Sequence, residues 1–491
     1  AVPGSLTLSP SWVLSGAVIA YLGAAAATAT SLWRAARLPI LAPARPRAWA
    51  LASEKALKNQ AFAGISLLTI AALIAAFGDR LNFGLIAGFT MMGALMFGAA
   101  LLLPLALDTA LKLLSPLANT PVAEWTLADT RQQVPGLSLA LMALMLALAT
   151  NIGVGTMVSS FRATFTGWLD QRLASEIYVT AATPRQAEDV REFLDRQADV
   201  TIPLRFAETR LRGAPGDILG VIDHTTYQEG WPLLVSEDDA WARVADGSGA
   251  LVNEQLWRRE GMRLGDPLEL LPGWSLPVVG AYADYGNPRG QAMVGQSELT
   301  SRVDGLSTLR FSARVAPERV PELAEGLMAL GVSRTGITNQ AQVKSFSLNV
   351  FERTFLVTGS LNVLTLGVAA FAMLASLTTL GAMRLPQVAP VWAMGITRRQ
   401  LARLELLRAG LCGLLTFILA LPLGLAVAWA LLAVVNVQAF GWRLPLLPFP
   451  LDWARLGLAA VFAATIAAVI PALRLARIAP SNLLKVFADE R

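Results

Sequence analysis

Seven apolar stretches, each near membrane-spanning length, constrain the fold of this chain more than any other feature. A helix needs about 20 apolar residues, at about 1.5 Å each, to cross a hydrocarbon layer of about 30 Å. The stretches lie at 11–33, 61–77, 83–107, 137–161, 354–383, 409–435 and 456–473. With 54% hydrophobic and 15% charged residues among 491, the chain is too apolar for a soluble protein of this size. We therefore predict an α-helical integral membrane protein.

The basic residues predict its orientation. They gather beside alternate span ends, including Arg34, Arg37, Lys112, Arg131, Arg384, Arg398, Arg399, Arg403, Arg408, Arg474 and Arg477. The short opposite connections hold only Arg80, Arg443 and Arg455. Because Lys and Arg stay preferentially in the cytoplasm, we expect a multi-pass membrane protein with these basic connections on the cytoplasmic side. Its C-terminus is expected to be cytoplasmic and residues 165–350 to lie on the opposite side.

The spans also carry few polar groups. Their centres lack charged residues, and Asn151 and Asn362 are the polar exceptions, which we interpret as interhelical hydrogen-bonding residues. An ion-coupled transporter, which needs charged residues along its path, is therefore disfavoured. The glycines of 83–107 are spaced for close helix approach, although glycine is generally common in membrane helices. They are Gly84, Gly88, Gly93 and Gly98.

Residues 165–350 have the pattern of a folded α+β domain. Two stretches read strand, helix, strand: EIYVTA, PRQAEDVREFLDRQ and VTIPLRFA, then TLRFSARV, APERVPELAEGLMALG and VSRTGIT. They predict one layer of the split βαβ kind. The runs GDILGVI, GALVN, DPLELL and SLPVVGAYADYG between them predict an inserted β-rich subdomain. Ser236 and Asp239 are spaced as a capping box for a helix there.

Two segments join this domain to the spans, 161–172 and 345–355. Both are compatible with helix and lack proline, so they predict continuous helical stalks that transmit movement. The alternative is that they are the frayed ends of two spans. The stalk residues that we single out are Phe161, Phe165, Trp168, Leu348, Phe351 and Phe355.

The stretch RLPQVAPVWAMGITRRQLAR, residues 384–403, lies between two spans on the expected cytoplasmic face. Pro386 and Pro390 are expected to stop the first span, and Thr397 to cap a short helix that leads into the next. Apolar side chains of this turn are expected to be available to a partner. They are Val391, Trp392, Met394 and Ile396.

Catalytic and metal-binding signatures are absent from the sequence. It contains no GxxxxGK[ST] phosphate loop, GxSxG, HExxH or paired CxxC. The single His, His224, lies in a polar region and the single Cys, Cys412, in an apolar one, which leaves no basis for a triad, a metal site or a disulfide. We predict no catalytic or metal-binding residue, no enzyme activity, no cofactor in this chain and no nucleic-acid partner.

A weak internal repeat relates the two ends of the chain. SLWRAARLPI and PALRLARIAP each place an Arg-x-x-Arg pair after an apolar run and before proline. We therefore expect an earlier, equivalent half upstream. The first span of this chain would be the last span of that half. The expected organisation is 1–40, last span of a first unit; 41–118, cytosolic linker and two central spans; 119–164, amphipathic segment and first span of a second unit; 165–350, periplasmic domain; 351–491, three spans with a cytosolic coupling helix and tail.

Residues 120–491 resemble the FtsX-like or MacB-like permeases of ABC transporters, the mechanotransmission or type VII group. The resemblance rests on AEWTLADTRQQVPG, GALVNEQLWRREGMRLGDPLEL, VWAMGITRRQLARLELLRAG and IPALRLARIAPSNLLKV. It implies a protein of the bacterial inner membrane, a ten-span parent and a porter-like periplasmic domain. It also implies a coupling helix that docks on a cytosolic ATPase homodimer. Carried over, the contacts are Val391, Trp392, Met394, Gly395, Arg398, Arg399 and Arg403. Val391 and Trp392 replace the basic residue common there in the family.

By that resemblance, ATP and Mg²⁺ belong to the partner ATPase. Membrane lipid, a periplasmic protein or lipoprotein, and the upstream permease half are further candidate partners, and the expected cargo is lipid, lipoprotein-like or otherwise hydrophobic. The alternative from another class is a membrane-anchored periplasmic scaffold or sensor without an ATPase. Copurification of an ATP-binding protein distinguishes the two.

Overall fold

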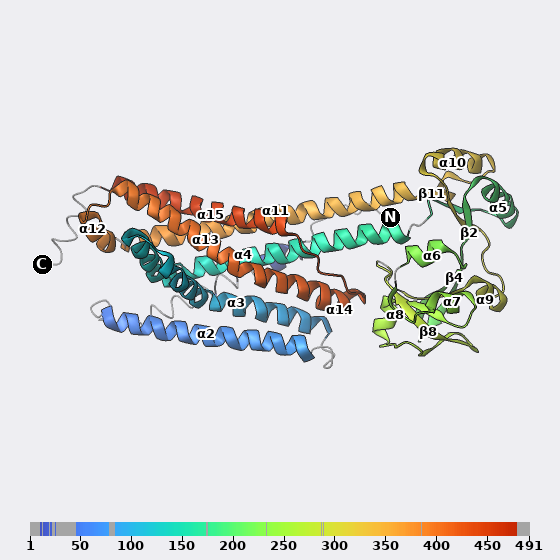
Figure 1. Ribbon diagram of the computed structural model, residues 1–491, viewed down its shortest axis with the longest axis horizontal. Helices are drawn as coiled ribbons and strands as arrows, with labels where there is room; N and C mark the ends of the chain where they lie inside the picture. Colours follow the sequence, from blue (N-terminus) through green and yellow to red (C-terminus); the bar gives the residue numbers. More distant parts are fainter. Residues whose placement is uncertain are drawn as a thin grey trace. The chain divides into compact units, whose positions relative to one another are not determined.

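The computed structural model describes residues 46–77, 84–172, 175–231, 233–285, 287, 289–383 and 385–478, with scattered positions between 10 and 25 (Figure 1). The expected first span at 11–33 lies largely outside these ranges, as do Arg34 and Arg37. The chain divides into two compact units, Ala1–Phe62 and Ala63–Arg491. All tertiary contacts given below are inside the second unit.

Six helical segments of the described ranges are long and apolar enough to cross a membrane. They are Leu57–Phe77, Gly84–Leu117, Pro121–Leu169, Gly359–Leu380, Arg398–Phe440 and Pro450–Arg477. The helices concerned are α2 (Pro46–Phe77), α3 (Gly84–Leu114), α4 (Pro121–Arg172), α11 (Gln340–Met383), α13 (Arg398–Trp429) and α15 (Pro450–Arg477). Shorter elements connect them: η3 (Ser115–Leu117), α12 (Leu385–Ala393), the π-helix η6 (Ala430–Val435) and α14 (Asn436–Phe440).

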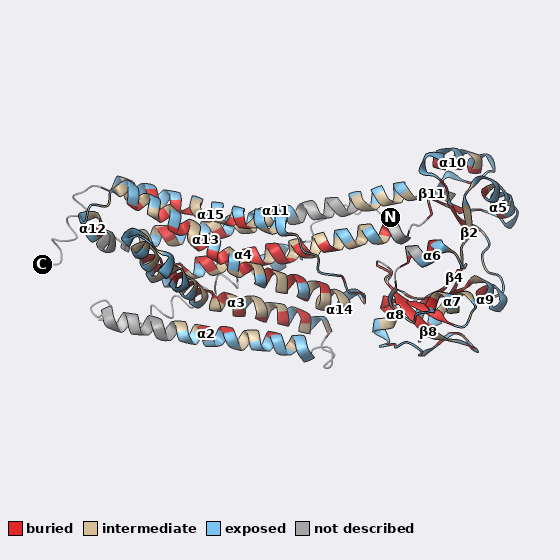
Figure 2. Cartoon of the chain, in the orientation of Figure 1, coloured by how far each residue is buried: buried red, intermediate tan, exposed pale blue. Residues whose placement is uncertain are grey.

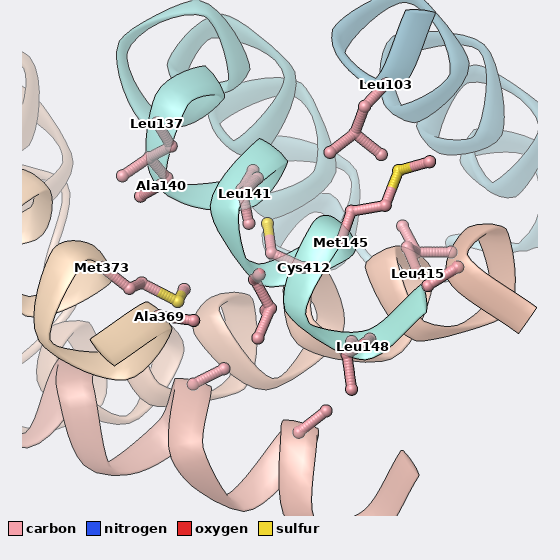
Figure 3. Close-up of a cluster of buried hydrophobic side chains, with 14 of the residues drawn as sticks. Leu103, Leu137, Ala140, Leu141, Met145, Leu148, Ala369, Met373, Cys412 and Leu415 are labelled. Atoms are coloured by element: carbon pink, nitrogen blue, oxygen red, sulfur yellow. The ribbon is translucent and has the colours of Figure 1, made fainter. Parts of the chain in front are cut away.

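The spans bury one side and expose the other. Five helices supply a shared apolar core, which includes Leu103 of α3, Leu141 and Leu148 of α4, Met373 of α11, Cys412 of α13 and Ala464 of α15 (Figure 3). Large apolar side chains also lie on the outside of the helices, among them Ile86, Leu139 and Phe371 (Figure 2). In water such surface would be costly, so it indicates contact with lipid.

Small residues let some of these helices approach closely. A Cβ on Gly98 would lie 3.0 Å from the Gly64 carbonyl oxygen, and one on Gly88 would lie 3.0 Å from Val435. The predicted role in close packing is therefore confirmed for these two glycines of α3. It is wrong for Gly84 and Gly93, because no atom of the described residues lies within 4 Å of either Cβ position.

Two helices run without interruption from the bundle to the α+β domain. Helix α4 has 52 residues and α11 has 44, which corresponds to about 78 Å and about 66 Å. Each is more than twice the length needed to cross the hydrocarbon layer. The predicted helical continuity is confirmed over its frayed-end alternative, since the helices continue through both joining segments. That the stalks transmit movement stays a prediction.

The α+β domain, which we call the head domain (residues 175–339), is built on a four-stranded antiparallel sheet. Its strand order is β11–β1–β10–β2, formed by Ile337–Asn339, Ile177–Thr180, Arg310–Arg314 and Val200–Pro203. Helices α5 (Pro184–Gln197) and α10 (Val320–Ala329) pack on it, with the short 3₁₀ turns η4 (Pro317–Arg319) and η5 (Arg334–Gly336). The first and last segments of the domain thus share one sheet, which confirms the split βαβ prediction.

The predicted β-rich insert is also present. Its strands are β3 (Arg205–Leu211), β4 (Ala214–Val221), β5 (Leu233–Ser236), β6 (Ala250–Asn253), β7 (Pro267–Leu271), β8 (Trp274–Tyr282) and β9 (Gly290–Gly295). They are ordered β3–β4–β9–β6–β8–β5, with β7 paired to β8. Helices α6 (Thr225–Gly230), α7 (Ala240–Ala245) and α8 (Glu254–Arg259) connect them, and α9 (Gln296–Arg302) leads from β9 to β10 of the first sheet.

Two local predictions in the insert have different outcomes. The capping box at Ser236 is wrong, because Ser236 ends β5 and pairs with Gly280, while α7 begins after Asp239 without a side-chain cap. His224, for which no metal-binding or catalytic role is predicted, is the N-cap of α6, and its Nδ1 accepts the Thr226 amide at 3.1 Å.

Candidate functional site

The candidate site is the turn between α11 and α13, at the end of the bundle away from the head domain (Figure 1). Helix α11 ends at Met383 and a separate helix, α12, follows. Pro386 lies in the first turn of α12, where a missing amide hydrogen costs nothing, and Pro390 lies inside it. The prolines therefore belong to a new helix after the span and do not simply end it.

A tight reversal joins α12 to α13. Gly395 takes a φ of +105°, a backbone conformation that disfavours any side chain. Its amide donates to the Trp392 carbonyl at 2.9 Å. Thr397 then caps α13 in a reciprocal box with Gln400, whose side chain accepts the Thr397 amide at 2.8 Å. The N-cap prediction is confirmed, and the direction of α13 is set by local chemistry.

The apolar residues of the turn divide into buried and exposed ones. Val391 is 6% exposed and packs with Leu401, so the prediction that it is available to a partner is wrong. Trp392 and Ile396 are half-buried against the same cluster, which also includes Trp125 of α4 and Leu475 of α15. Met394 is 77% exposed.

The three predicted arginines of this turn also differ. Arg398 donates from Nη1 to the Ile478 carbonyl at 2.7 Å, just beyond the end of α15. A cation at this position satisfies a carbonyl that the helix leaves free. Arg399 and Arg403 are exposed. The exposed face of the turn is thus formed by Met394, Gly395, Arg399 and Arg403, while Val391 and Arg398 hold the turn to the bundle.

Behind the turn lies a buried charge cluster that the sequence analysis missed. Arg408 of α13, only 3% exposed, donates to Asp129 of α4 at 3.0 Å and also to Glu405. Gln133 donates to the same Asp129 oxygen at 2.9 Å. These side chains were overlooked because Asp129 and Glu405 lie just before the apolar runs and Arg408 read as a marker of the membrane face. The spacing of Glu405 and Arg408 by three residues in a helix was an available signal.

A second pair lies beside this cluster. Arg131 of α4 donates to Asp108 of α3 at 3.0 Å, and Lys112 lies within 2.5 Å of the same carboxylate. Together the charged groups tie α3 and α13 to α4 at the end of the bundle that carries the turn. The start of α13, which follows the turn, is therefore held to α4 by charged contacts.

The predicted stalk residues of α4 form an aromatic row. Phe161 stacks on Phe165 at 5.6 Å between ring centroids, and Phe165 stacks on Trp168 at 5.7 Å. Trp168 in turn donates from Nε1 to the Ala283 carbonyl of the head domain at 3.3 Å. On α11, Leu348 is half-buried, and the side chains of Phe351 and Phe355 lie outside those described.

Inside the bundle, Asn151 of α4 donates to the Asn362 carbonyl of α11 at 3.2 Å and its side-chain oxygen accepts Thr365 at 3.1 Å. For Asn151 the predicted interhelical hydrogen bond is confirmed. For Asn362 the backbone carbonyl makes the contact.

Residues 359–480, from α11 to the end of α15, match the FtsX-like permease C-terminal family model. These helices include the turn, the buried charge cluster on α13 and the Arg398 contact. The C-terminal helices of the chain are therefore similar to those of the FtsX-like permeases. The predicted resemblance to this group is thus confirmed, together with a multi-pass membrane protein that carries an α+β domain.

A curated relative of this chain is an uncharacterised ABC transporter permease protein of Mycobacterium tuberculosis. The two are 28% identical over 365 residues, which is 69% of this chain and 42% of the relative. The chain therefore spans less than half the length of that relative.

Two solved structures are similar to parts of the chain. The periplasmic region of MacB from Actinobacillus actinomycetemcomitans matches with 12% identity and a TM-score of 0.27, over 36% of this chain and 95% of that one. A domain of a putative permease protein from Porphyromonas gingivalis matches with 11% identity and a TM-score of 0.20, over 33% of this chain and 77% of that one.

Proposed function

We propose that this permease is a noncatalytic transmembrane subunit of an ABC transporter that passes ATP-driven movement of a cytosolic ATPase to the head domain. The observation that carries the proposal is the continuity of the parts. The 384–403 turn is fixed to α4, α13 and α15, and α4 continues as one helix to the head domain. A push on the turn therefore has a rigid path to the other end of the molecule.

The exposed face of the turn suits a protein partner. Met394 offers an apolar anchor, and Arg399 and Arg403 offer cations that can pair with carboxylates. We assign the docking contact to this face and the positioning of the turn to Val391 and Arg398. The partner we propose is an ATPase homodimer that binds ATP and Mg²⁺ and carries out hydrolysis.

For this arrangement the turn and the C-terminus face the cytoplasm and the head domain faces the periplasm. The charge distribution supports this orientation, because the turn carries several arginines. The lipid-facing bundle and its large outer domain suit a hydrophobic cargo, such as a lipid or lipoprotein, or a periplasmic partner. An upstream permease half would complete the transporter.

Copurification tests the docking contact. The double variant Met394→Asp with Arg399→Glu changes only exposed side chains, so it should fold normally and lose the bound ATPase. The matched control is Met328→Asp with Arg334→Glu, which makes the same exchanges on exposed positions of the head domain. Equal retention of the ATPase by both variants would refute the docking assignment. Absence of any ATPase from the unaltered protein would favour the scaffold or sensor alternative.

Labelling of intact cells tests the orientation. A cysteine at Arg334 should react with a membrane-impermeant maleimide, and a cysteine at Arg399 should react only after the membrane is opened. The native Cys412 is buried and should not react with the maleimide. The opposite pattern would overturn the proposal at once.

A further inference from the structure

The head domain contacts the membrane bundle at a third place, apart from the two stalks. The segment that follows α14, between α13 and α15, lies against both α4 and helix α8 of the insert. The Arg443 amide donates to Oε1 of Glu254 at 3.0 Å, and the Leu447 amide donates to Oγ of Ser160 at 3.1 Å. Gly441 turns the chain there with a φ of +81°.

Aromatic side chains fill the same contact. Trp442 is buried and lies edge-on to Tyr285 of the head domain, with 6.5 Å between the ring centroids. Tyr285 lies edge-on to Trp168 of the α4 stalk, with 6.1 Å between the ring centroids. Burial, and secondarily the negative charge of Glu254, raises the pKa of Tyr285 to about 12. The phenol is therefore neutral at physiological pH and suits an apolar contact.

The contact is buried, but several of its polar atoms lack hydrogen-bond partners among the described residues. Glu254 is almost fully buried, and its Oε1 also accepts Arg258 at 2.6 Å. Three other buried atoms at this place have no hydrogen-bond partner among the described residues: Oε2 of Glu254, Oε1 of Gln255 and Nε1 of Trp442. A buried polar atom without a partner costs free energy, which it recovers when it is exposed to water. Separation of the two surfaces would therefore be opposed less than in a well-satisfied interface.

The element before this segment is also unusual. Helix α13 starts at the 384–403 turn and passes at its other end into the π-helix η6. π-helical turns are rare and often lie at functional sites, since their extra residue is not accommodated by regular α-helical hydrogen bonding. One helix thus connects the proposed docking turn to the third contact through an irregular turn.

We propose that Trp442 and Arg443 with Glu254 and Tyr285 form a releasable latch, which holds the head domain to the bundle in one state of the transport cycle and opens in another. The latch rests on the proposed function. Glu254 is its positioning residue, because its carboxylate joins α8 to the backbone beyond α14. The head domain is then controlled at the latch as well as through its stalks.

A cysteine pair tests the latch. A Cβ built on Gly441 lies 3.7 Å from Cβ of Gln255, close to the separation of about 3.8 Å usual in disulfides. In a complex with the copurifying ATPase, Gly441→Cys with Gln255→Cys should cross-link at least about tenfold faster in one nucleotide state than in another. The states compared are nucleotide-free, ATP-bound and ADP with vanadate.

A matched pair inside the insert is the control. Gly247 has a φ of +79°, similar to that of Gly441, and its Cβ position lies 3.4 Å from Cβ of Glu298. Gly247→Cys with Glu298→Cys should cross-link at one rate in all states. The same rate for the Gly441 pair in all three states would overturn the latch. Because the ATPase is bound in that experiment, this result would leave the proposed function intact.

A measurement on the unaltered complex tests the latch even if a double-cysteine variant does not fold. The Arg443 amide is hydrogen-bonded only when the latch is closed, so its hydrogen exchange should speed up at least about tenfold in the open state. Equal protection of this amide with and without nucleotide would also overturn the proposal.

Discussion

Replacement of Arg408 by Met should destabilise the bundle strongly. The side chain is buried and contacts both Asp129 and Glu405, so its replacement removes a cation that both carboxylates contact. Loss of one partner from a buried ion pair costs about 3–5 kcal/mol. Because Met matches the size of the Arg stem, little of this loss comes from packing.

The measurement is thermal unfolding of the purified protein in detergent, for which such a loss should lower the melting temperature by several degrees. Arg403→Met is the control, since Arg403 lies on the same helix and is exposed. Adding Asp129→Asn to Arg408→Met should restore part of the stability, because it removes one of the stranded charges. Equal melting temperatures for Arg408→Met and Arg403→Met would refute the reasoning.

Three further predictions concern packing and charge. Gly98→Leu should separate α3 from α2 and lower the melting temperature, whereas Gly93→Leu, whose Cβ position has nothing within 4 Å, should change it little. Val391→Asp should destabilise the turn by about 2–4 kcal/mol, because it buries a charge. Met394→Asp changes an exposed residue and should alter the free energy of unfolding by no more than about 0.5 kcal/mol. Unfolding of the two purified variants measures both effects. The stability of the head domain should fall as the pH rises from 10 to 12. The reason is that the pKa of Tyr285 is about 12 in the folded protein and about 10 in the unfolded chain, so the unfolded chain loses the phenol proton first. Tyr285→Phe should flatten that alkaline loss in a pH series of melting temperatures, and an unchanged slope would contradict it.

The sequence alone determined the elements whose signals are local. A run of about 20 apolar residues predicts a span because the hydrocarbon layer imposes that length, and all six described spans were found in this way. The two strand, helix, strand patterns of the head domain and the Thr397 cap depend on residues close together in the chain. Such signals can be read from the sequence without knowledge of the fold.

Only the tertiary structure decided which residues of the turn are buried and which charges meet. Asp129 and Arg408 are 279 positions apart, and Arg443 and Glu254 are 189 apart, so no local pattern marks either pair. Val391 and Met394 have similar hydrophobicity and lie three residues apart, but Leu401 covers the first and nothing comparable covers the second. Burial and long-range pairing depend on how the helices pack, because each side chain's neighbours come from elements that the sequence places far away.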